Sequence, residues 1–224
     1  MKKTFKYRLY PKKFQREKID QTLETCRILY NDFLAERKNA YEKEQKKITC
    51  FEQINYLPSK KETSPFLGKI FSQILQDIAK RVHKNFQAFF RRLKNSTTKA
   101  GYPRFKQYGR YDSFTYPQHG FKLANQKQLK LSGFGLVNIR KHRKLVGTIK
   151  TCSILVKNGK YYACFSCEVE VKSLPKTGKQ VGFDLGLTSF LATSDGKLYQ
   201  APKTYKKAEK KLGEIQRVVS KRKS

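Results

Sequence analysis

The sequence predicts an α+β fold, in which a small antiparallel β-barrel carries a helical insertion and is followed by the start of an α/β domain. Three observations support this prediction. Apolar residues recur at helical spacing through residues 11–95, strand-like runs replace them in residues 113–171, and an apolar strand with one acid follows Lys179. At 224 residues, the chain is long enough for one large domain or two small ones.

Positive charge dominates the composition, because 50 Lys and Arg residues face 17 Asp and Glu residues and the formal net charge is +33. Between Asp77 and Glu168 the only acid is Asp112, whereas a solvated surface normally mixes both signs. Such an excess predicts a continuous positive surface that binds nucleic acid, with an affinity that falls steeply as salt rises. The alternatives are a ribosomal-type RNA-binding protein and a charge that serves solubility alone.

Two long amphipathic helices are predicted within the insertion. They cover about residues 14–41 and 65–93, because apolar residues recur every three or four positions in both segments. A short helix over residues 51–57, stopped by Pro58, is expected between them. We expect the two long helices to pack as an antiparallel pair, and neither carries a cluster of catalytic residues.

The strands of the predicted barrel come from two separate parts of the sequence. One strand is expected at residues 4–10, and five or more follow within residues 113–171. The pair Asn158-Gly159 between two of them is a strong hairpin signal, since both residues accept positive φ. If the first strand pairs with the later ones, the helical region becomes an insertion into a β domain.

Residues 94–112 combine Gly, Pro, Ser and Thr with Lys and Arg, which predicts an exposed basic loop. Aromatic rings beside cations are the combination that stacks on bases and holds phosphates. The alternative is an ordinary surface loop whose Phe105 packs into the core. The candidate nucleic-acid-binding residues of the loop and the preceding helix are Arg91, Arg92, Tyr102, Arg104, Phe105, Lys106 and Arg110.

The last segment begins with QVGFDLGL, an apolar strand in which Asp184 is costly to bury without a partner or a cation. A second strand, a turn at Asp195-Gly196 and a basic helix from about Tyr205 follow. This order is typical of the opening of an RNase H-like sheet, where such an Asp binds Mg²⁺ for phosphodiester cleavage. The alternative is a structural Asp with a partner. The helix adds the candidate binding residues Lys206, Lys207 and Lys210.

Zinc and a membrane are not expected as partners. Cys164 and Cys167 form a CxxC pair, but no second pair follows, and positions three apart on a strand point to opposite faces. His83, His119 and His142 are scattered. The sequence has no run of apolar residues long enough for a membrane span, and its five cysteines at irregular spacing fit a reducing cytosol.

Four stretches together resemble the TnpB family, the RNA-guided nucleases encoded by bacterial insertion sequences and related to type V CRISPR effectors. They are FKYRLYPKKFQREKIDQTLETCRILYNDFLAER, AGYPRFKQYGRYDSFTYPQ, NGKYYACFSCEVE and VGFDLGLTSFLATSDG. They are similar, in that order, to the family's N-terminus, its basic loop with the returning strand, its hairpin and its first RuvC motif. The resemblance covers nearly all of the chain and implies a cytoplasmic, nucleoid-associated protein of a bacterium or an archaeon.

The resemblance also implies an architecture and partners. The implied parts are a wedge-type β-barrel from residues 1–10 and 113–177, a helical recognition insert at 11–95, the basic loop at 96–112, and an incomplete RuvC nuclease domain at 178–224. A guide RNA and a target DNA would be the partners, with base pairing reading the sequence and the protein reading shape and a flanking motif. Asp184 would be a catalytic residue and the first ligand for Mg²⁺.

One departure from the family affects the expected activity. The family's RuvC site needs a Glu and a second Asp from later in the chain, and its four-Cys zinc ribbon also lies later. The sequence ends at Ser224 before these, and neither Asp195 nor Glu209 replaces the missing ligands. We therefore expect a nucleic-acid-binding protein that resembles a truncated RNA-guided DNA endonuclease of a transposable element and does not cut DNA alone. The alternative is a binding module of the same descent that acts without cleavage, for example as a repressor.

Overall fold

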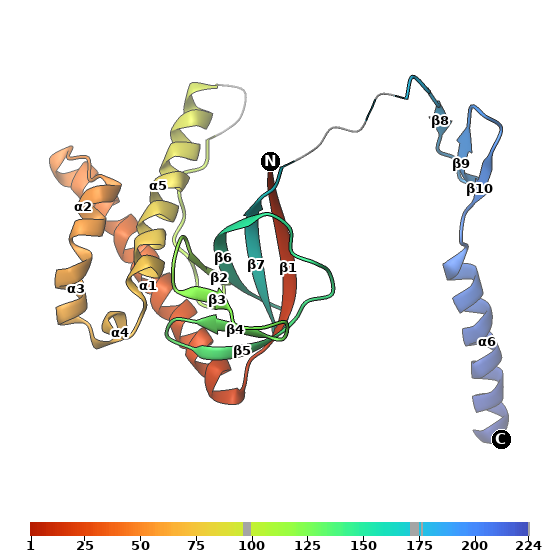
Figure 1. The fold of residues 1–224 in the computed structure, drawn as a ribbon, viewed down its shortest axis with the longest axis horizontal. Coiled ribbons are helices and arrows are strands. Elements are labelled where there is room, and N and C mark those ends of the chain that lie inside the picture. Colours follow the sequence, from red (N-terminus) through yellow and green to blue (C-terminus); the bar gives the residue numbers. More distant parts are fainter. Residues whose placement is uncertain (96–99, 171–174, 176, 224) are drawn as a thin grey trace. The chain divides into compact units, whose positions relative to one another are not determined.

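The computed structural model of the chain describes residues 1–95, 100–170, 175 and 177–223. It divides into two compact units, Met1–Val171 and Lys172–Ser224, and each is described by itself (Figure 1). Both units combine helices with antiparallel sheets. Residues 96–99 of the predicted loop, residues 171–174 and 176 of the predicted barrel, and Ser224 lie outside the described residues. No described helix has both the length and the apolar character needed to cross a membrane.

The first unit contains one antiparallel sheet with the order β2-β6-β7-β1-β5-β4-β3. Its strands are β1 (Lys2–Tyr10), β2 (Ser113–Tyr116), β3 (Phe121–Leu123), β4 (Gln128–Leu131), β5 (Gly135–Arg140), β6 (Thr148–Lys157) and β7 (Lys160–Glu168). The first strand pairs with β7 on one side and β5 on the other, as predicted. The helical region is therefore inserted between the first strand and the rest of the sheet (Figure 1).

Local sequence explains the centre of this sheet. Along β1 the side chains alternate, with Phe5, Tyr7 and Leu9 buried and their neighbours facing outward, which is the period-two pattern of a strand with one covered face. The hairpin predicted between β6 and β7 is confirmed, because Asn158 and Gly159 both have positive φ, 51° and 65° and the flanking strands pair directly.

The two edge strands of the sheet, β2 and β3, are joined by residues 117–120 alone. So short a link spans at most about 18 Å, and it therefore keeps the two edges near each other. The Tyr116 hydroxyl donates a hydrogen bond to the carbonyl of Ser132 (2.8 Å), and the amide of Ser132 donates to the carbonyl of Gly120 (2.7 Å). Gly120 has φ +91° with aromatic rings packed against its Cα, so a larger residue would be strained there.

The inserted helices are α1 (Lys13–Glu44), α2 (Cys50–Asn55), α3 (Leu57–Thr63), α4 (Pro65–Gly68) and α5 (Ser72–Lys94). Two predicted boundaries were wrong for one reason. Pro58 does not end the helical region but lies in the first turn of α3, and Pro65 begins the single turn of α4 instead of the long helix α5. Proline is tolerated in the first turn of a helix, because the missing N–H has no partner there in any case.

The predicted antiparallel packing of α1 against α5 is also wrong. Contacts advance together along both helices, since Tyr30 accepts a hydrogen bond from Asn85 and, further along α1, Arg37 lies over the ring of Phe86. The two helices thus run in the same general direction, as Figure 1 shows. The three short helices α2, α3 and α4 return the chain to the starting end, which periodicity in the long helices could not reveal.

One hydrophobic core joins the sheet to the helices. Large side chains with less than 2% exposure come from both, including Tyr7, Phe114 and Phe165 of the sheet and Phe33 and Ile74 of the helices. The side chain of the buried Gln15, at the start of α1, also donates hydrogen bonds to the carbonyls of two residues in and before β5. The helical insertion is thereby fixed to the sheet by apolar packing and by a satisfied buried amide.

The second unit contains β8 (Phe183–Asp184), β9 (Ser189–Thr193), β10 (Leu198–Gln200) and α6 (Thr204–Lys223). The strands form a small antiparallel sheet in the order β10-β9-β8. Its large apolar side chains are exposed, as are those along α6: Val181, Phe183, Leu185, Leu187, Phe190, Leu198, Leu212, Ile215, Val218 and Val219. The described strands and helix of the second unit therefore leave apolar surface open.

Candidate nucleic-acid interface

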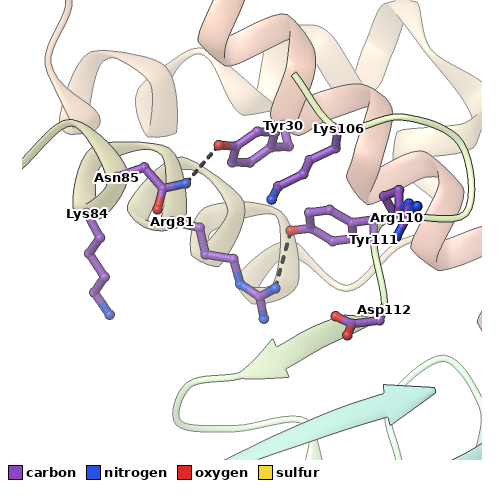
Figure 2. Close-up of a pocket in the computed structure, with 8 residues that line it drawn as sticks. All are labelled: Tyr30, Arg81, Lys84, Asn85, Lys106, Arg110, Tyr111 and Asp112. Carbon is purple, nitrogen blue, oxygen red and sulfur yellow. Dashed lines mark hydrogen bonds between the residues drawn. The ribbon is translucent and has the colours of Figure 1, made fainter. Parts of the chain in front are cut away.

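A pocket of about 260 Å³ lies where α1, α5 and the segment leading into β2 meet (Figure 2). Four cationic side chains and one carboxylate line it, together with two tyrosines and an amide: Arg81, Lys84, Lys106, Arg110, Asp112, Tyr30, Tyr111 and Asn85. We call this the basic pocket. Its mixture of cations, rings and hydrogen-bonding groups is the chemistry that holds phosphates and sugars.

Arg81 is the most firmly held of the four cations. Its guanidinium donates to Asp77 (2.8 Å), to the carbonyl of Ser113 (2.8 Å) and to the hydroxyl of Thr115 (2.8 Å). Burial opposes its charge, but Tyr111 and Asp77 outweigh burial and hold its pKa above the ordinary value. Arg81 therefore fixes α5 to β2 and shapes the pocket, while its hydrogen bonds are largely used within the protein.

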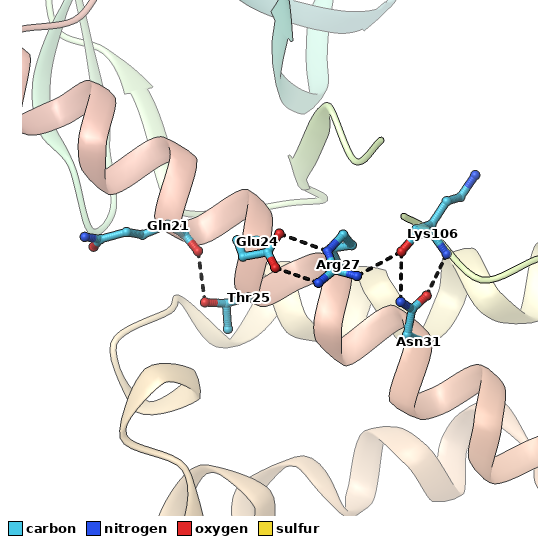
Figure 3. A network of polar contacts seen from close by, with 6 residues as sticks. All are labelled: Gln21, Glu24, Thr25, Arg27, Asn31 and Lys106. Atoms are coloured by element: carbon cyan, nitrogen blue, oxygen red, sulfur yellow. Dashed lines mark hydrogen bonds and ion pairs between the residues drawn. The ribbon is translucent and has the colours of Figure 1, made fainter. Parts of the chain in front are cut away.

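A polar clamp sets the position of Lys106 on the other wall (Figure 3). Arg27 and Asn31 of α1 both donate to the carbonyl of Lys106 at 2.9 Å, and the Lys106 amide donates to Asn31 at 2.8 Å. Glu24 holds Arg27 through two hydrogen bonds of 2.9 and 2.6 Å. Because the clamp uses only the backbone of Lys106, the Lys106 ammonium extends into the pocket beside Tyr30, 5.9 Å from the ring centroid.

The far end of α5 carries an aromatic cluster. Burial along α5 stops at Val82, whereas Phe90 and Leu93 are each 52% exposed. Tyr102 packs edge-on against Phe86 and Phe89, with ring centroids 5.6 and 5.3 Å away. These rings form a half-open surface instead of core.

Several of the predicted binding residues meet at this end of α5. Arg92 donates to the carbonyl of Gly101 (3.2 Å), which brings Arg91 and Arg92 next to the start of the loop and Tyr102. Arg104 and Phe105 are exposed, so the alternative in which Phe105 packs into the core is wrong. The predicted residues Arg92 and Tyr102 thus lie close to the same end of α5.

Sequence reasoning missed a second group of cations and rings, on the outward face of the sheet. The Lys6 ammonium lies 4.1 Å from the ring centroid of Tyr162, and the Arg8 guanidinium lies 5.1 Å from the same centroid. Arg8 also donates to the Tyr162 hydroxyl at 3.2 Å and stands opposite Arg140 of β5. The alternation of Lys6 and Arg8 with buried residues predicts that both face outward. It could not indicate their shared partner Tyr162, which is 154 positions from Arg8.

The sequence predicted a buried strand around Asp184, but in the structure this strand is exposed. Asp184 pairs with Ala192 of β9 at the edge of the small sheet and is exposed, because no further layer of the second unit covers that strand. Asp195 is held at a turn by Lys197 (2.9 Å), and hydrogen bonds from Thr193 and Lys197 lower its pKa. Lys206, Lys207 and Lys210 are exposed on α6.

Neither Mg²⁺, which the sequence predicts, nor zinc, which it does not, has a complete ligand set among the described residues. No three His, Cys, Asp or Glu side chains within them gather in a way that could hold a metal ion. Asp184 alone offers too few oxygens for Mg²⁺, so the donors present do not fit a metal pair. On β7, Cys167 faces the core and Cys164 the opposite side, as expected for positions three apart on a strand.

Comparison with known proteins finds relatives of the kind that the sequence resembles. Residues 1–46 match the family HTH_OrfB_IS605, described as a helix-turn-helix domain. Over 222 residues the chain is 29% identical to InsQ of Escherichia coli strain K12, whose name places it among RNA-guided DNA endonucleases; the match covers 97% of this chain and 54% of InsQ. A similarly named protein of Streptomyces pristinaespiralis is 27% identical over 228 residues, or 99% of this chain and 55% of its own. These matches support the resemblance to the TnpB family.

The chain spans about half the length of the curated relatives that it matches. Residues 1–46, matched as a helix-turn-helix, form the strand β1 and the single helix α1 in the structure. Two solved structures are also similar: a Cas12f1–sgRNA–target DNA complex (15% identity, TM-score 0.44, 99% of this chain and 62% of that chain) and a CRISPR–Cas12f ternary complex (13%, 0.43, 92% and 52%).

Proposed function

We propose that the chain binds a structured guide RNA and its DNA target, within an RNA-guided endonuclease system of a transposable element. The observation that carries this proposal is the basic pocket. There, a loop backbone is clamped to α1, and the Lys106 side chain extends into a pocket that Lys84 and Arg110 also line, in a chain of net charge +33. Its relatives named as RNA-guided DNA endonucleases support the choice of partners.

The candidate residues have different roles in this proposal. Cations of the basic pocket and of α6 hold backbone phosphates, which contribute affinity without sequence preference. The cluster around Tyr102 and the exposed Phe105 offer ring faces on which unpaired bases can stack. Arg91, Arg92 and Arg104 flank these rings, so that a strand stacked there has cations within reach of its backbone.

The proposal includes the architecture. The sheet of residues 1–10 and 113–170 is proposed to be a wedge-type barrel, which the short link between its edge strands β2 and β3 supports. The helices α1 to α5 correspond to a recognition insert. The antiparallel strands β8, β9 and β10 correspond to the opening of a RuvC domain, with Asp184 at the position of its first metal ligand.

A cleavage-independent role is the second candidate function. It is favoured by the surroundings of Asp184, which belongs to no group of three or more possible metal ligands within the described part of the chain. One carboxylate cannot align a water and stabilise a leaving oxygen through two metal ions. We therefore propose that this chain by itself binds without cutting, as a repressor would.

Binding is tested by titrating the full chain with RNA transcribed from the DNA that flanks its coding sequence, over a series of salt concentrations. An unrelated RNA of equal length is the control. We expect the flanking RNA to stay bound at salt that releases the control, because shaped contacts add to counterion release. Equal release of both RNAs would show a nonspecific polyanion binder and would contradict the proposal.

Cleavage is tested separately with the same ribonucleoprotein, a matched DNA target and Mg²⁺. We expect intact DNA with both the unmodified chain and Asp184→Ala. Cleavage that disappears in Asp184→Ala would overturn the proposal of binding without cutting, yet would leave the proposed partners intact.

A further inference from the structure

A groove with a cavity volume of about 940 Å³ lies between α1, the short helices α3 and α4, and Tyr108 of the loop. We call it the α1 groove. Its walls are α1 from Glu17 to Asp32, residues 60–70, and the Tyr108 ring. It shares no lining residue with the basic pocket, although α1 forms a wall of both.

The charge of this groove differs from that of the rest of the chain. Four acids and three lysines line it, so its formal charge is negative in a chain of net charge +33. The acids Glu17, Asp20 and Glu24 are three or four positions apart, which places them on one face of α1. Lys60, one of the three lysines, is already paired with Glu36 at 2.5 Å. Among the described ion pairs none involves Glu17 or Asp32, so both carboxylates are available to a partner.

Apolar side chains lie between these acids. Ile28 continues the same face of α1 and is 47% exposed, while Phe66 of α4 is 70% exposed and Tyr108 is 83% exposed. Below them, Leu29, Leu67 and Ile70 form a buried floor. Large apolar side chains gathered in a groove mark a protein-binding surface, because scattered single exposures are ordinary and a lined groove is not.

We infer that the α1 groove binds a basic amphipathic helix of a protein partner. Lysines or arginines on the flanks of such a helix meet Glu17, Asp20 and Asp32, and its apolar face meets Ile28 and Phe66. From Glu17 to Asp32, α1 extends about 22 Å, which matches about four turns of a partner helix. Complementary charge at the rim would set orientation and association rate, and the apolar contacts would supply most of the affinity.

The same charges disfavour two other occupants. A nucleic acid would place its phosphates beside the four lining carboxylates of α1, a like-charge contact that the three lining lysines do not outweigh. A second copy of this chain, docked by a two-fold axis, would set the same acids against themselves. A basic helix meets neither obstacle.

The test titrates the full chain with a labelled peptide of about 15 residues, in which Leu recurs at helical spacing and Lys fills the other positions. A peptide of the same composition with scrambled spacing is the control probe. We expect saturable binding of the amphipathic peptide alone. Phe66→Ser should weaken it by about tenfold or more, as for the loss of a central apolar anchor.

Matched variants separate the groove from the rest of the surface. Phe51→Ser removes an equally exposed ring on α2, outside the groove, and should leave peptide affinity unchanged. The double variant Glu17→Lys and Asp32→Lys should weaken binding, whereas Glu44→Lys at the other end of α1 should not. Equal behaviour of Phe66→Ser and Phe51→Ser would overturn the inference. So would a loss of RNA affinity, or a change of molecular mass in solution, that is specific to Phe66→Ser, since these would reveal RNA or a second copy as the occupant.

Discussion

The two units of this chain use similar side chains in different ways. In Met1–Val171, rings such as Tyr7, Phe114 and Phe165 are wholly buried, and cations are arranged around a core that joins sheet and helices. In Lys172–Ser224, Phe183, Leu187 and Leu212 are exposed and α6 projects its cations without a packed layer behind them. The contrast shows that positive charge alone does not make a nucleic-acid-binding site, because the cations must also be held in position. The first unit can hold a guanidinium or an ammonium in one position, whereas the second presents exposed point charges.

The largest expected effect concerns the core of the first unit. Phe165→Ala should destabilise it by about 3–5 kcal/mol, because the ring is fully buried against Tyr7 and Phe121 and its loss leaves a cavity. Phe183→Ala in the second unit should change stability by no more than about 0.5 kcal/mol, since that ring is mostly exposed. Thermal unfolding of both variants measures the difference. Similar losses would show that the second unit has a core of its own.

The next effect is on RNA affinity at fixed salt. Replacing Lys84, Lys106 and Arg110 together by Ala should weaken binding by roughly 100-fold or more, because each contributes a phosphate contact from a positioned side chain. The corresponding triple replacement in α6, of Lys206, Lys207 and Lys210, should weaken it by roughly tenfold through lost counterion release. Filter binding with one RNA compares the two. If the α6 variant loses more, the comparison between the units is reversed.

A smaller effect is expected from the aromatic end of α5. Tyr102→Ala removes a ring that packs on Phe86 and Phe89 and offers its other surface to solvent. The loss of one base-stacking contact costs about 1–3 kcal/mol of binding free energy. Tyr41→Ala, which removes an exposed ring on α1, is the control. Equal affinities of the two variants for single-stranded RNA would exclude stacking at Tyr102.

The smallest effect concerns the clamp that positions Lys106. Hydrogen bonds from Arg27 lower the pKa of Glu24 below its ordinary value, so this ion pair adds stability above the unfolded-state pKa of about 4.3. The contribution disappears as the pH falls through the lower folded-state value. Glu24→Gln should lower the free energy of unfolding by at most about 1 kcal/mol at neutral pH, because the pair is partly exposed. At acidic pH, where Glu24 is protonated, the substitution should leave the free energy of unfolding unchanged. Unfolding by urea at neutral and acidic pH measures it, and an equal cost at both would contradict the assignment.

Sequence reasoning recovered the strands, the hairpin at Asn158-Gly159 and the two long helices, because each depends on local periodicity or turn chemistry. It failed where the outcome depends on distant partners. The parallel course of α1 and α5 follows from three short helices whose prolines start turns instead of ending them. The exposure of Asp184 follows from the absence of a covering layer within its unit, which an apolar run cannot indicate.

The candidate site shows the same division. Lys106 and Arg110 could be named from a basic loop with rings, since composition alone suggests that chemistry. Lys84 and the clamp by Arg27 and Asn31 could not, because they lie on helices 20 to 80 positions away and look like ordinary solvated polar residues. The Lys6–Tyr162 contact was hidden for the same reason.

The central claim is that the first unit makes the shaped contact with RNA. Photocrosslinking of the full chain to RNA that carries 4-thiouridine, followed by mass spectrometry of the attached peptides, tests it most directly. We predict crosslinks to the segment that contains Tyr102, Phe105 and Lys106, and their loss in the Lys84, Lys106 and Arg110 triple variant. Crosslinks confined to α6, unchanged in that variant, would contradict the account.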